Sequence, residues 1–313
     1  MSSLDARWAD QPLVADTLTR RFGAKRAVDG VTLQVPRGVV YGLVGENGAG
    51  KTTLIKLALG LLRPNEGAVR VFGVDPVRDP EAALSHIGYL SEDHDVPRWM
   101  RVEELMRYTR AFYPKWDQAY ADELLQRFDL DRRAKIKNLS RGQRAQAGLL
   151  AAMAHRPDLL LLDEPSSGLD PVVRREILGA IIRTVAEEGR TVLFSSHLVD
   201  EVERVADHVA MIHEGRIVLD SPLDAIKSSH HRLTLRFAEA QSSAPAVAGA
   251  LLSEGTGREW TVVCNGQIAE LREGAKRLGA QIVEEQTPSL EEIFVARVKH
   301  GRVGSNRPAL GRA

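Results

Sequence analysis

One stretch of sequence decides how this chain folds, and it is Gly45-Glu46-Asn47-Gly48-Ala49-Gly50-Lys51-Thr52-Thr53. A glycine, four residues, a second glycine, a lysine and a hydroxyl residue follow one another, which is the pattern of a phosphate-binding loop. Glycines let successive backbone N–H groups converge on a phosphate, and Lys51 can reach the β and γ phosphates. The Thr52 hydroxyl is placed to ligate Mg²⁺. The alternative is an ordinary glycine-rich turn between a strand and a helix.

The segments on either side support the phosphate-binding interpretation. Residues 39–44 (VVYGLV) are typical of a strand, and aliphatic residues recur at helical spacing over 54–62, so the order is strand, glycine loop, helix. Further along, residues 159–162 (LLLL) predict a buried strand, 172–187 a helix and 191–195 another strand. This alternation predicts an α/β fold with a parallel sheet.

The buried strand at 159–162 is followed directly by Asp163 and Glu164. An aspartate at the tip of such a strand can hold the Mg²⁺ of a P-loop enzyme, and the adjacent glutamate is a candidate to orient the attacking water. Buried strands also often end in an acidic turn, so this pair alone is ambiguous. The segment 139–143 (LSRGQ) is ambiguous too, because a serine at a helix start is usually only a cap.

The order of these segments along the chain is specific. GENGAGKTT, LSRGQ, LLLLDEP and SGLD follow one another, and Ser196-His197 comes after them. In this order the chain resembles the nucleotide-binding domain of ABC transporters, over roughly residues 13–225. The resemblance implies ATP and Mg²⁺ as cofactors and ATP hydrolysis as the activity.

The resemblance also implies a set of site residues. Lys51, Glu164 and His197 would be catalytic, and Thr52, Glu92 and Asp163 would hold the metal. The ATP-binding set would be Phe22, which would stack on adenine, with Gly45, Glu46, Asn47, Gly48, Ala49, Gly50, Lys51, Thr52, Thr53, Ser140, Gly142 and Gln143. Taken alone, Phe22 is more typical of a core residue and His197 of a solvated loop. In this family two domains face each other head to tail, so the segment at 139–143 would close over ATP held by a second copy.

Two positions depart from the family's usual pattern. Arg141 stands in the signature LSRGQ where a glycine is common, while Gly142, the expected amide donor, is retained. Glu92 stands where a glutamine is expected; it can ligate a hard cation through oxygen but adds negative charge near the phosphates. Single-cassette exporter subunits often resemble this chain there. An exposed loop acid is an equal alternative.

Next to this position, residues 96–100 (VPRWM) place bulky apolar side chains in a polar loop. In the resembled family this region docks the membrane subunit, and exposed Trp and Met side chains suit an interface. The alternative is that Trp99 packs locally on the helix that starts at Val102.

Composition narrows the class of protein and its compartment. The 313 residues include 42 Lys and Arg against 42 Asp and Glu, and this balance gives no electrostatic footprint for nucleic acid. Cys264 is the one cysteine, which excludes an intramolecular disulfide and indicates a reducing, cytosolic compartment. The start does not resemble a secretory signal, and no apolar run approaches the ~18 residues of a membrane helix. We therefore expect a cytoplasmic protein, peripheral at the inner face of the cell membrane.

The sequence pattern predicts an ABC-type cassette at 13–225 followed by a smaller domain. Within the cassette we expect a P-loop NTPase core with a parallel sheet, an N-terminal antiparallel β subdomain, and an inserted helical subdomain at about 86–155.

A small α+β accessory domain is expected at 230–298. Polar and apolar residues alternate over 232–237, and Ser289 with Glu292 forms a capping box that predicts the start of a helix. The tail at 299–313, rich in Gly, Arg and Pro, is expected to be disordered.

Together these features predict the ATP-hydrolysing motor subunit of a bacterial ABC exporter. Its expected partners are a membrane-spanning permease in a separate chain and a second nucleotide-binding subunit, as a homodimer; no nucleic acid is expected. The ending at 288–294 (PSLEEIF) is similar to that of exporter ATPases. The alternative is a soluble ABC ATPase acting on ribosomes or DNA, although such relatives usually carry two cassettes or a long coiled coil. An importer motor, disfavoured by the signature and by Glu92, is a third hypothesis.

Overall fold

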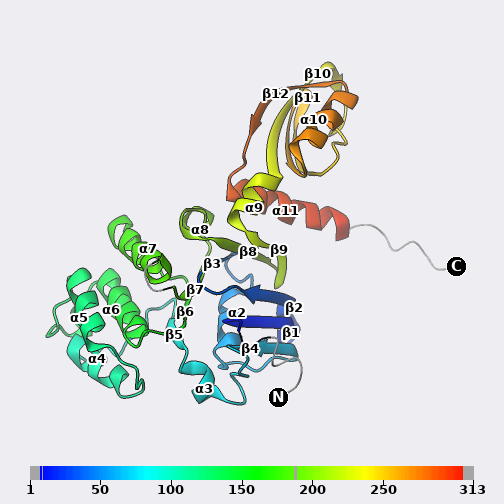
Figure 1. Ribbon diagram of the computed structural model, residues 1–313. Helices are drawn as coiled ribbons and strands as arrows, with labels where there is room; N and C mark the ends of the chain where they lie inside the picture. Colours follow the sequence, from blue (N-terminus) through cyan, green and yellow to red (C-terminus); the bar gives the residue numbers. More distant parts are fainter. Residues whose placement is uncertain (1–7, 9, 187–188, 306–313) are drawn as a thin grey trace. The chain divides into compact units, whose positions relative to one another are not determined.

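The computed structural model describes residue 8, residues 10–186 and residues 189–305 of the chain (Figure 1). The chain divides into two compact units, residues 1–220 and residues 221–313. Each unit contains a cluster of buried apolar side chains of its own.

A six-stranded sheet forms the centre of the first unit. Its strands lie in the order β5 (Ile87–Leu90), β6 (Leu159–Leu162), β7 (Thr191–Ser196), β3 (Val40–Val44), β8 (His208–His213) and β9 (Arg216–Pro222). Neighbouring strands from β5 to β8 are parallel. Strands β3 and β6 are buried at every position, which explains why their sequences are apolar runs and do not alternate.

Parallel pairing fixes where the loops leave this sheet. Val44 at the end of β3 is in register with Ser196 at the end of β7. Leu162 at the end of β6 pairs with Phe194 of β7 and with Leu90 at the end of β5. The loops after these four strands therefore leave at one edge, and ligand sites in open α/β sheets form at this carboxyl edge.

A second sheet of the first unit is antiparallel and shares its core with the first. Its strands lie in the order β2 (Lys25–Val35), β1 (Leu13–Phe22) and β4 (Glu66–Arg70). Helix α2 (Lys51–Ala58) buries Leu54, Ile55 and Leu57 in this core, where they meet Leu18 of β1 and Leu43 of β3. The helix that follows the glycine loop is thus fixed by its apolar face.

The first unit also contains several further helices. They are α3 (Pro80–Leu84), α4 (Val102–Arg110), α5 (Gln118–Arg127), the 3₁₀ turn η1 (Ile136–Asn138), α6 (Arg141–Met153), α7 (Pro171–Ala186) and α8 (Val199–Val205). Figure 1 shows α4, α5 and α6 grouped together. Helix α5 starts where the Asp117 carboxylate accepts a hydrogen bond from the Tyr120 N–H at 2.9 Å, and it buries Ala121, Leu124 and Leu125.

The second unit is an α+β fold around a three-stranded antiparallel sheet. Its strands lie in the order β11 (Ala250–Asn265), β10 (His230–Gln241) and β12 (Ala280–Gln286), and its helices are α9 (Leu223–Ser229), α10 (Ile268–Arg277) and α11 (Leu290–Ser305). One face of the sheet buries Leu233, Leu235 and Trp260 together with Leu271 of α10. Within the part of the chain that the structure describes, every helix is too short or too polar to cross a bilayer.

The predicted capping box at the start of α11 is confirmed. The Ser289 N–H donates to Glu292 at 2.8 Å, and the Glu292 N–H donates to the Ser289 hydroxyl at 3.1 Å. Because the helix that it opens continues to Ser305, the expectation of disorder from Lys299 onward is wrong for residues 299–305. Residues 306–313 lie outside the described residues.

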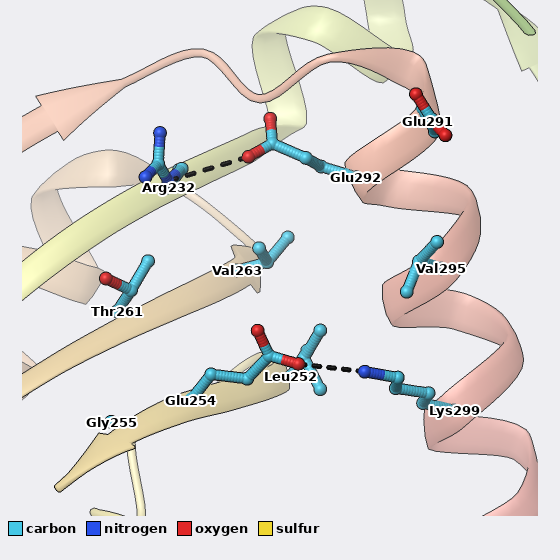
Figure 2. A pocket seen from close by; sticks show the side chains of 10 residues that line it. All are labelled: Arg232, Leu252, Glu254, Gly255, Thr261, Val263, Glu291, Glu292, Val295 and Lys299. Carbon is cyan, nitrogen blue, oxygen red and sulfur yellow. Dashed lines mark hydrogen bonds and ion pairs between the residues drawn. The ribbon is translucent and has the colours of Figure 1, made fainter.

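A cleft of about 640 Å³ lies between β11 and α11 in the second unit (Figure 2). Arg232 and Glu292 form an ion pair at 3.6 Å, and Lys299 and Glu254 form another at 2.8 Å. Between these pairs the figure shows apolar side chains, among them Val295. The charged groups of the cleft largely satisfy one another, and solvent-exposed pairs of this kind contribute about 0–1 kcal/mol each. We assign no ligand to this cleft.

Candidate functional site

The predicted phosphate-binding loop connects β3 to α2, and two of its glycines tolerate no side chain. A Cβ atom on Gly45 would lie 2.4 Å from the carbonyl oxygen of Ile212. Gly50, the N-cap of α2, has a φ of 117°, and a Cβ atom there would lie 2.3 Å from the carbonyl oxygen of Ala27. The glycines therefore allow the loop to pack tightly against β2 and β8 while α2 begins at its end.

The loop borders a cleft of about 300 Å³ in the first unit. The cleft is lined by Phe22, Lys25, Ala27, Asn47, Gly48, Gly50, Lys51, Thr52, Thr53, Glu92 and Glu164. The fold thus brings together residues from β1, the glycine loop, the loop after β5 and the end of β6. Gly45, Glu46 and Ala49 complete the loop without lining the cleft.

Lys25 and Ala27 are the cleft residues that sequence reasoning missed. The signal that could have found them is strand pairing, because β1 and β2 form a hairpin in which Phe22 pairs with Lys25. The Lys25 ammonium lies 4.0 Å from where a Cβ atom of Gly48 would be, so a second cation borders the loop beside Lys51.

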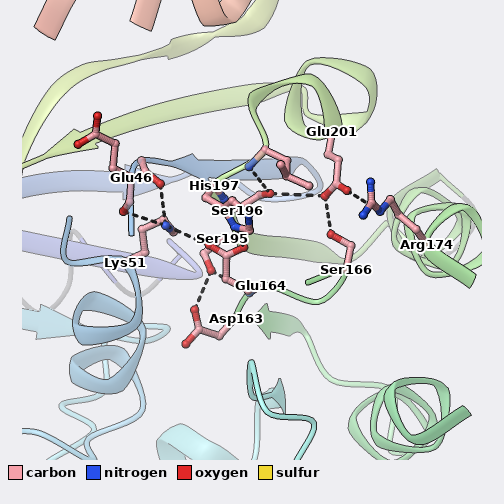
Figure 3. Close-up of polar contacts among 12 residues, drawn as sticks. Glu46, Lys51, Asp163, Glu164, Ser166, Arg174, Ser195, Ser196, His197 and Glu201 are labelled. Atoms are coloured by element: carbon pink, nitrogen blue, oxygen red, sulfur yellow. Dashed lines mark hydrogen bonds and ion pairs between the residues drawn. The ribbon is translucent and has the colours of Figure 1, made fainter. Parts of the chain in front are cut away.

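Lys51 is 5% exposed, and oxygen atoms surround its ammonium group (Figure 3). It donates hydrogen bonds to the carbonyl oxygens of Gly45 at 2.7 Å and Glu46 at 3.2 Å. It also forms an ion pair with Glu164 Oε1 at 3.0 Å. A buried ammonium held this way presents positive charge at the floor of the cleft.

Glu164 joins Lys51 to His197. The Glu164 carboxylate lies 2.7 Å from Nδ1 of His197 through Oε2, and the same oxygen accepts from the His197 backbone N–H at 3.3 Å. Glu164 is 4% exposed and has a φ of 49°, an uncommon conformation for a residue with a side chain. The three residues predicted to be catalytic therefore form one contiguous cluster.

Asp163 is buried beside this cluster. Its carboxylate accepts a hydrogen bond from the Ser195 hydroxyl at 2.7 Å and is hydrogen-bonded with the Thr52 side chain. Burial raises the pKa of Asp163 above its usual value, and the hydrogen bonds with Ser195 and Thr52 oppose that shift. The Ser195 oxygen in turn accepts from the Glu164 N–H at 2.9 Å, so this serine, which the sequence did not single out, orders both acids.

A magnesium ion fits this donor set. Within the described residues there is no group of three or more His, Cys, Asp or Glu side chains that could form a protein-only cage. Mg²⁺ bound with a nucleotide keeps waters and phosphate oxygens as ligands and needs only one or two oxygens from the protein. Thr52, which lines the cleft, and Asp163, which is hydrogen-bonded with it, supply such oxygens.

Phe22 and Glu92 lie on the walls of the cleft and are exposed. Phe22 is 47% exposed, which excludes the core position that the residue alone suggested. The Arg20 guanidinium lies 4.7 Å from the centre of its ring. Glu92 belongs to the loop after β5, and its position on the cleft wall favours a role at the site over that of an unrelated loop acid.

The signature segment does not lie at this cleft. Ser140 and Gln143 form a capping box at the start of α6: the Gln143 N–H donates to the Ser140 hydroxyl at 3.1 Å, and the Ser140 N–H donates to Gln143 at 3.0 Å. Gly142 is buried, and a Cβ atom there would lie 2.9 Å from the Val173 side chain of α7. All three predicted residues are described, and none of them lines the cleft.

Arg141, the departure from the usual signature, packs on the loop after β6. A Cβ atom on Gly168 would lie 2.5 Å from a guanidinium nitrogen of Arg141. The arginine side chain therefore occupies the space above Gly168 and leaves the backbone of α6 intact.

The loop after β5 contains a second candidate surface. Trp99 is 73% exposed, which disfavours the alternative that it packs locally. The expectation of an exposed methionine is wrong, because Met100 is 5% exposed and belongs to the core. A groove of about 460 Å³ runs between this loop and the helices α4 and α6, and its lining includes Val96, Pro97 and Tyr113.

The fold and the cleft define a P-loop nucleotide-binding protein: a parallel sheet, a glycine loop that opens a helix, a buried lysine, and acids at the end of the neighbouring strand. The fold class predicted from the sequence is confirmed.

Comparison with known proteins identifies the family. The sequence model of the family described as "ABC transporter" matches residues 28–167. The chain is 36% identical to the daunorubicin resistance ATP-binding protein DrrA3 of Streptomyces coeruleorubidus, over 70% of this chain and 71% of that protein. It is 27% identical to the ABC transporter ATP-binding protein YtrB of Bacillus subtilis, over 90% of this chain and 96% of that protein.

A solved structure of the ATP-binding subunit of an ABC transporter is 30% identical, with a TM-score of 0.63, and the match covers 69% of this chain and 91% of that one. The chain belongs to the ABC transporter family, as an ATP-binding subunit with the ATPase cassette of that family.

Proposed function

We propose that this chain is the ATP-hydrolysing motor of an exporter and that it drives a membrane-spanning permease in a separate chain. The observation that carries the hydrolytic part is the contact of Glu164 with both Lys51 and His197. The export direction is supported by the relative named for drug resistance, which matches over 70% of this chain.

The proposed roles follow from the cleft geometry. The adenine of ATP stacks on Phe22, and its phosphates follow the loop at 45–53. Lys51 and His197 stabilise negative charge on the γ-phosphate, and Glu164 orients the attacking water in line with the bond that breaks. When bound, Mg²⁺ held by Thr52 and Asp163, with Glu92 on the same cleft, supplies further positive charge to the phosphates.

A second copy is needed to complete the site in this proposal. Ser140, Gly142 and Gln143 do not line the cleft of their own chain, and they lie at the start of α6, where the first N–H groups of a helix lack partners within the helix. A head-to-tail homodimer would place this segment over ATP held by the partner. ATP would then favour dimer closure, and hydrolysis would release it.

The groove beside the loop after β5 is the proposed docking place of the permease. It joins apolar residues to the same loop that contributes Glu92 to the nucleotide cleft. Exposed aromatic side chains nearby, Trp99, Tyr108 and Phe112, are typical of an interface. This arrangement supports a peripheral position at the inner face of the cell membrane.

The test is capture of the Glu164→Gln variant from solubilised membranes in the presence of ATP and Mg²⁺. We expect this variant to bind ATP and stay closed without turning over, so that a polytopic membrane protein is recovered with it. Lys51→Ala, which removes the ammonium at the phosphates, serves as the matched control and should recover less of the same partner.

Each part of the proposal can fail separately. Hydrolysis by purified Glu164→Gln at the wild-type rate would show that the role of Glu164 is wrong. Recovery of ribosomes, DNA or only soluble proteins would leave the ATPase chemistry in place and contradict the exporter assignment.

A further inference from the structure

A buried carboxylate outside the cleft, Glu201 on α8, contacts the loops that carry both Glu164 and His197 (Figure 3). Its side chain is 6% exposed. The single oxygen Oε2 accepts a hydrogen bond from the Ser166 hydroxyl at 2.5 Å and another from the Ser196 hydroxyl at 3.4 Å. One carboxylate oxygen thus connects the loop after β6 to Ser196 at the end of β7, directly before His197.

The other oxygen of Glu201 is balanced by a cation. Arg174 on α7 forms an ion pair with Oε1 at 3.0 Å. Burial of a carboxylate is unfavourable unless it is paired and hydrogen-bonded, and here both oxygens have partners. The carboxylate is therefore held between α7, α8, the loop after β6 and the end of β7.

The contact with Ser166 bears on Glu164, which lies two positions earlier. Glu164 has a φ of 49°, and a non-glycine residue keeps this strained conformation only where surrounding contacts impose it. Contacts on both sides of the residue impose it: its own N–H donates to Ser195 at 2.9 Å, and Ser166 is held by Glu201. The same conformation directs the Glu164 carboxylate to Lys51 and His197.

The contact with Ser196 bears on His197 in the same way. The Ser196 hydroxyl accepts from the Leu198 N–H at 3.0 Å and lies within reach of Glu201. The backbone on both sides of His197 is thereby tied to α8. A shift of the Glu201 carboxylate would move Ser166 and Ser196 together.

We propose that Glu201 is a positioning residue for ATP hydrolysis, which fixes the distance between Glu164 and His197 by binding the loops of both through one carboxylate oxygen. This inference rests on the roles proposed above for Glu164 and His197. It predicts an effect on turnover and not on nucleotide binding, because Glu201 contacts neither the glycine loop nor the cleft wall.

The test uses the purified full chain and compares Glu201→Gln, Ser166→Ala and the double variant. We expect kcat to fall about tenfold in each single variant, which corresponds to the loss of one strong hydrogen bond, while KM for ATP stays within about twofold. Both changes break the hydrogen bond between Ser166 and Glu201, so kcat of the double variant should equal that of the less active single variant. Ser166→Ala removes one hydroxyl only and reports on the link even where Glu201→Gln folds poorly.

Asp200→Asn is the matched control, since it removes an exposed carboxylate from the same helix and should leave kcat unchanged. Wild-type kcat in both single variants, additive losses in the double variant, or a rise in KM without a fall in kcat would each overturn the inference. Glu164→Gln is measured in the same series. If Glu164→Gln hydrolyses ATP at the wild-type rate, the proposed site is wrong. If Glu164→Gln is inactive but the Glu201 and Ser166 variants hydrolyse ATP at the wild-type rate, the site is correct and the positioning role of Glu201 is wrong.

Discussion

Lys51, Glu164 and His197 contact one another in that order, and the contacts that hold Lys51 and Glu164 come from backbone carbonyls and a serine hydroxyl. Lys51 is anchored by the carbonyl oxygens of its own loop. Glu164 depends on the hydroxyl of Ser195, which accepts its N–H and donates to Asp163. At the residue scale the chemistry of the cleft therefore depends on backbone and hydroxyl partners as much as on the charged groups.

Phe22 provides a prediction at this scale. In Phe22→Ala we expect KM for ATP to rise about tenfold with kcat little changed, because base stacking is worth about 1–3 kcal/mol and is equal in the ground and transition states. Steady-state ATPase assays measure both constants. Phe112→Ala, which removes another exposed ring that does not line the cleft, is the control. A fall in kcat at constant KM would contradict the stacking role.

Helix α6 performs two tasks at its two ends. Its first turn presents the signature segment, with Ser140 and Gln143 satisfying each other's backbone groups. Directly after its last turn, His155 stacks on Tyr113 with ring centres 3.6 Å apart and donates from Nε2 to the carbonyl oxygen of Ile87 in β5 at 3.1 Å. The buried histidine thus anchors the helix to the start of β5, the strand whose following loop contains Glu92.

A pH dependence follows from this anchor. Burial lowers the pKa of His155 from 6.5 to about 4, so the unfolded chain binds a proton that the folded protein does not. The stability that this neutral histidine contributes is complete above pH 6.5 and is lost as the pH falls towards about 4. Burial also lowers the pKa of His94 and of His230, which acts in the same direction.

Urea unfolding between pH 7 and pH 4.5 measures this effect. We expect the free energy of unfolding of the first unit to fall as the pH is lowered, with a contribution from His155 on the order of 3 kcal/mol. His155→Gln keeps a donor for the carbonyl of Ile87 but does not titrate, so its pH slope should be smaller. Equal slopes in the two proteins would show that His155 is not the titrating group.

On the scale of the whole molecule, the chain consists of two units with separate cores. Every residue that lines the nucleotide cleft belongs to the first unit, residues 1–220. The second unit has its own three-stranded sheet, and its buried cysteine, Cys264, has its pKa raised by burial to about 12, which leaves the thiol protonated and inert.

This separation predicts two thermal transitions, of which ATP shifts only one. A ligand raises the stability of the unit that binds it, by about 2.7 kcal/mol at a hundredfold excess over Kd, which corresponds to about 5–10 °C. Calorimetry of Glu164→Gln with ATP and Mg²⁺ measures the shift without turnover. Trp260→Phe, a change in the core of the second unit, identifies its transition. A shift of both transitions together would show that the units unfold as one.

The chemistry of the loops could be predicted from the amino-acid sequence alone. The glycine loop, the acids after the apolar run at 159–162 and the order of the motifs predicted the fold class, the family and most of the cleft, because a phosphate loop is a local backbone structure that its own residues specify. Which distant groups meet could be seen only once the chain was folded. Strand register brought Lys25 beside Phe22, and packing exposed Trp99 while it buried Met100. Glu201 acquired its place because α8 packs where the loops after β6 and β7 converge, and such contacts between remote segments leave no periodic or spacing signal in the chain.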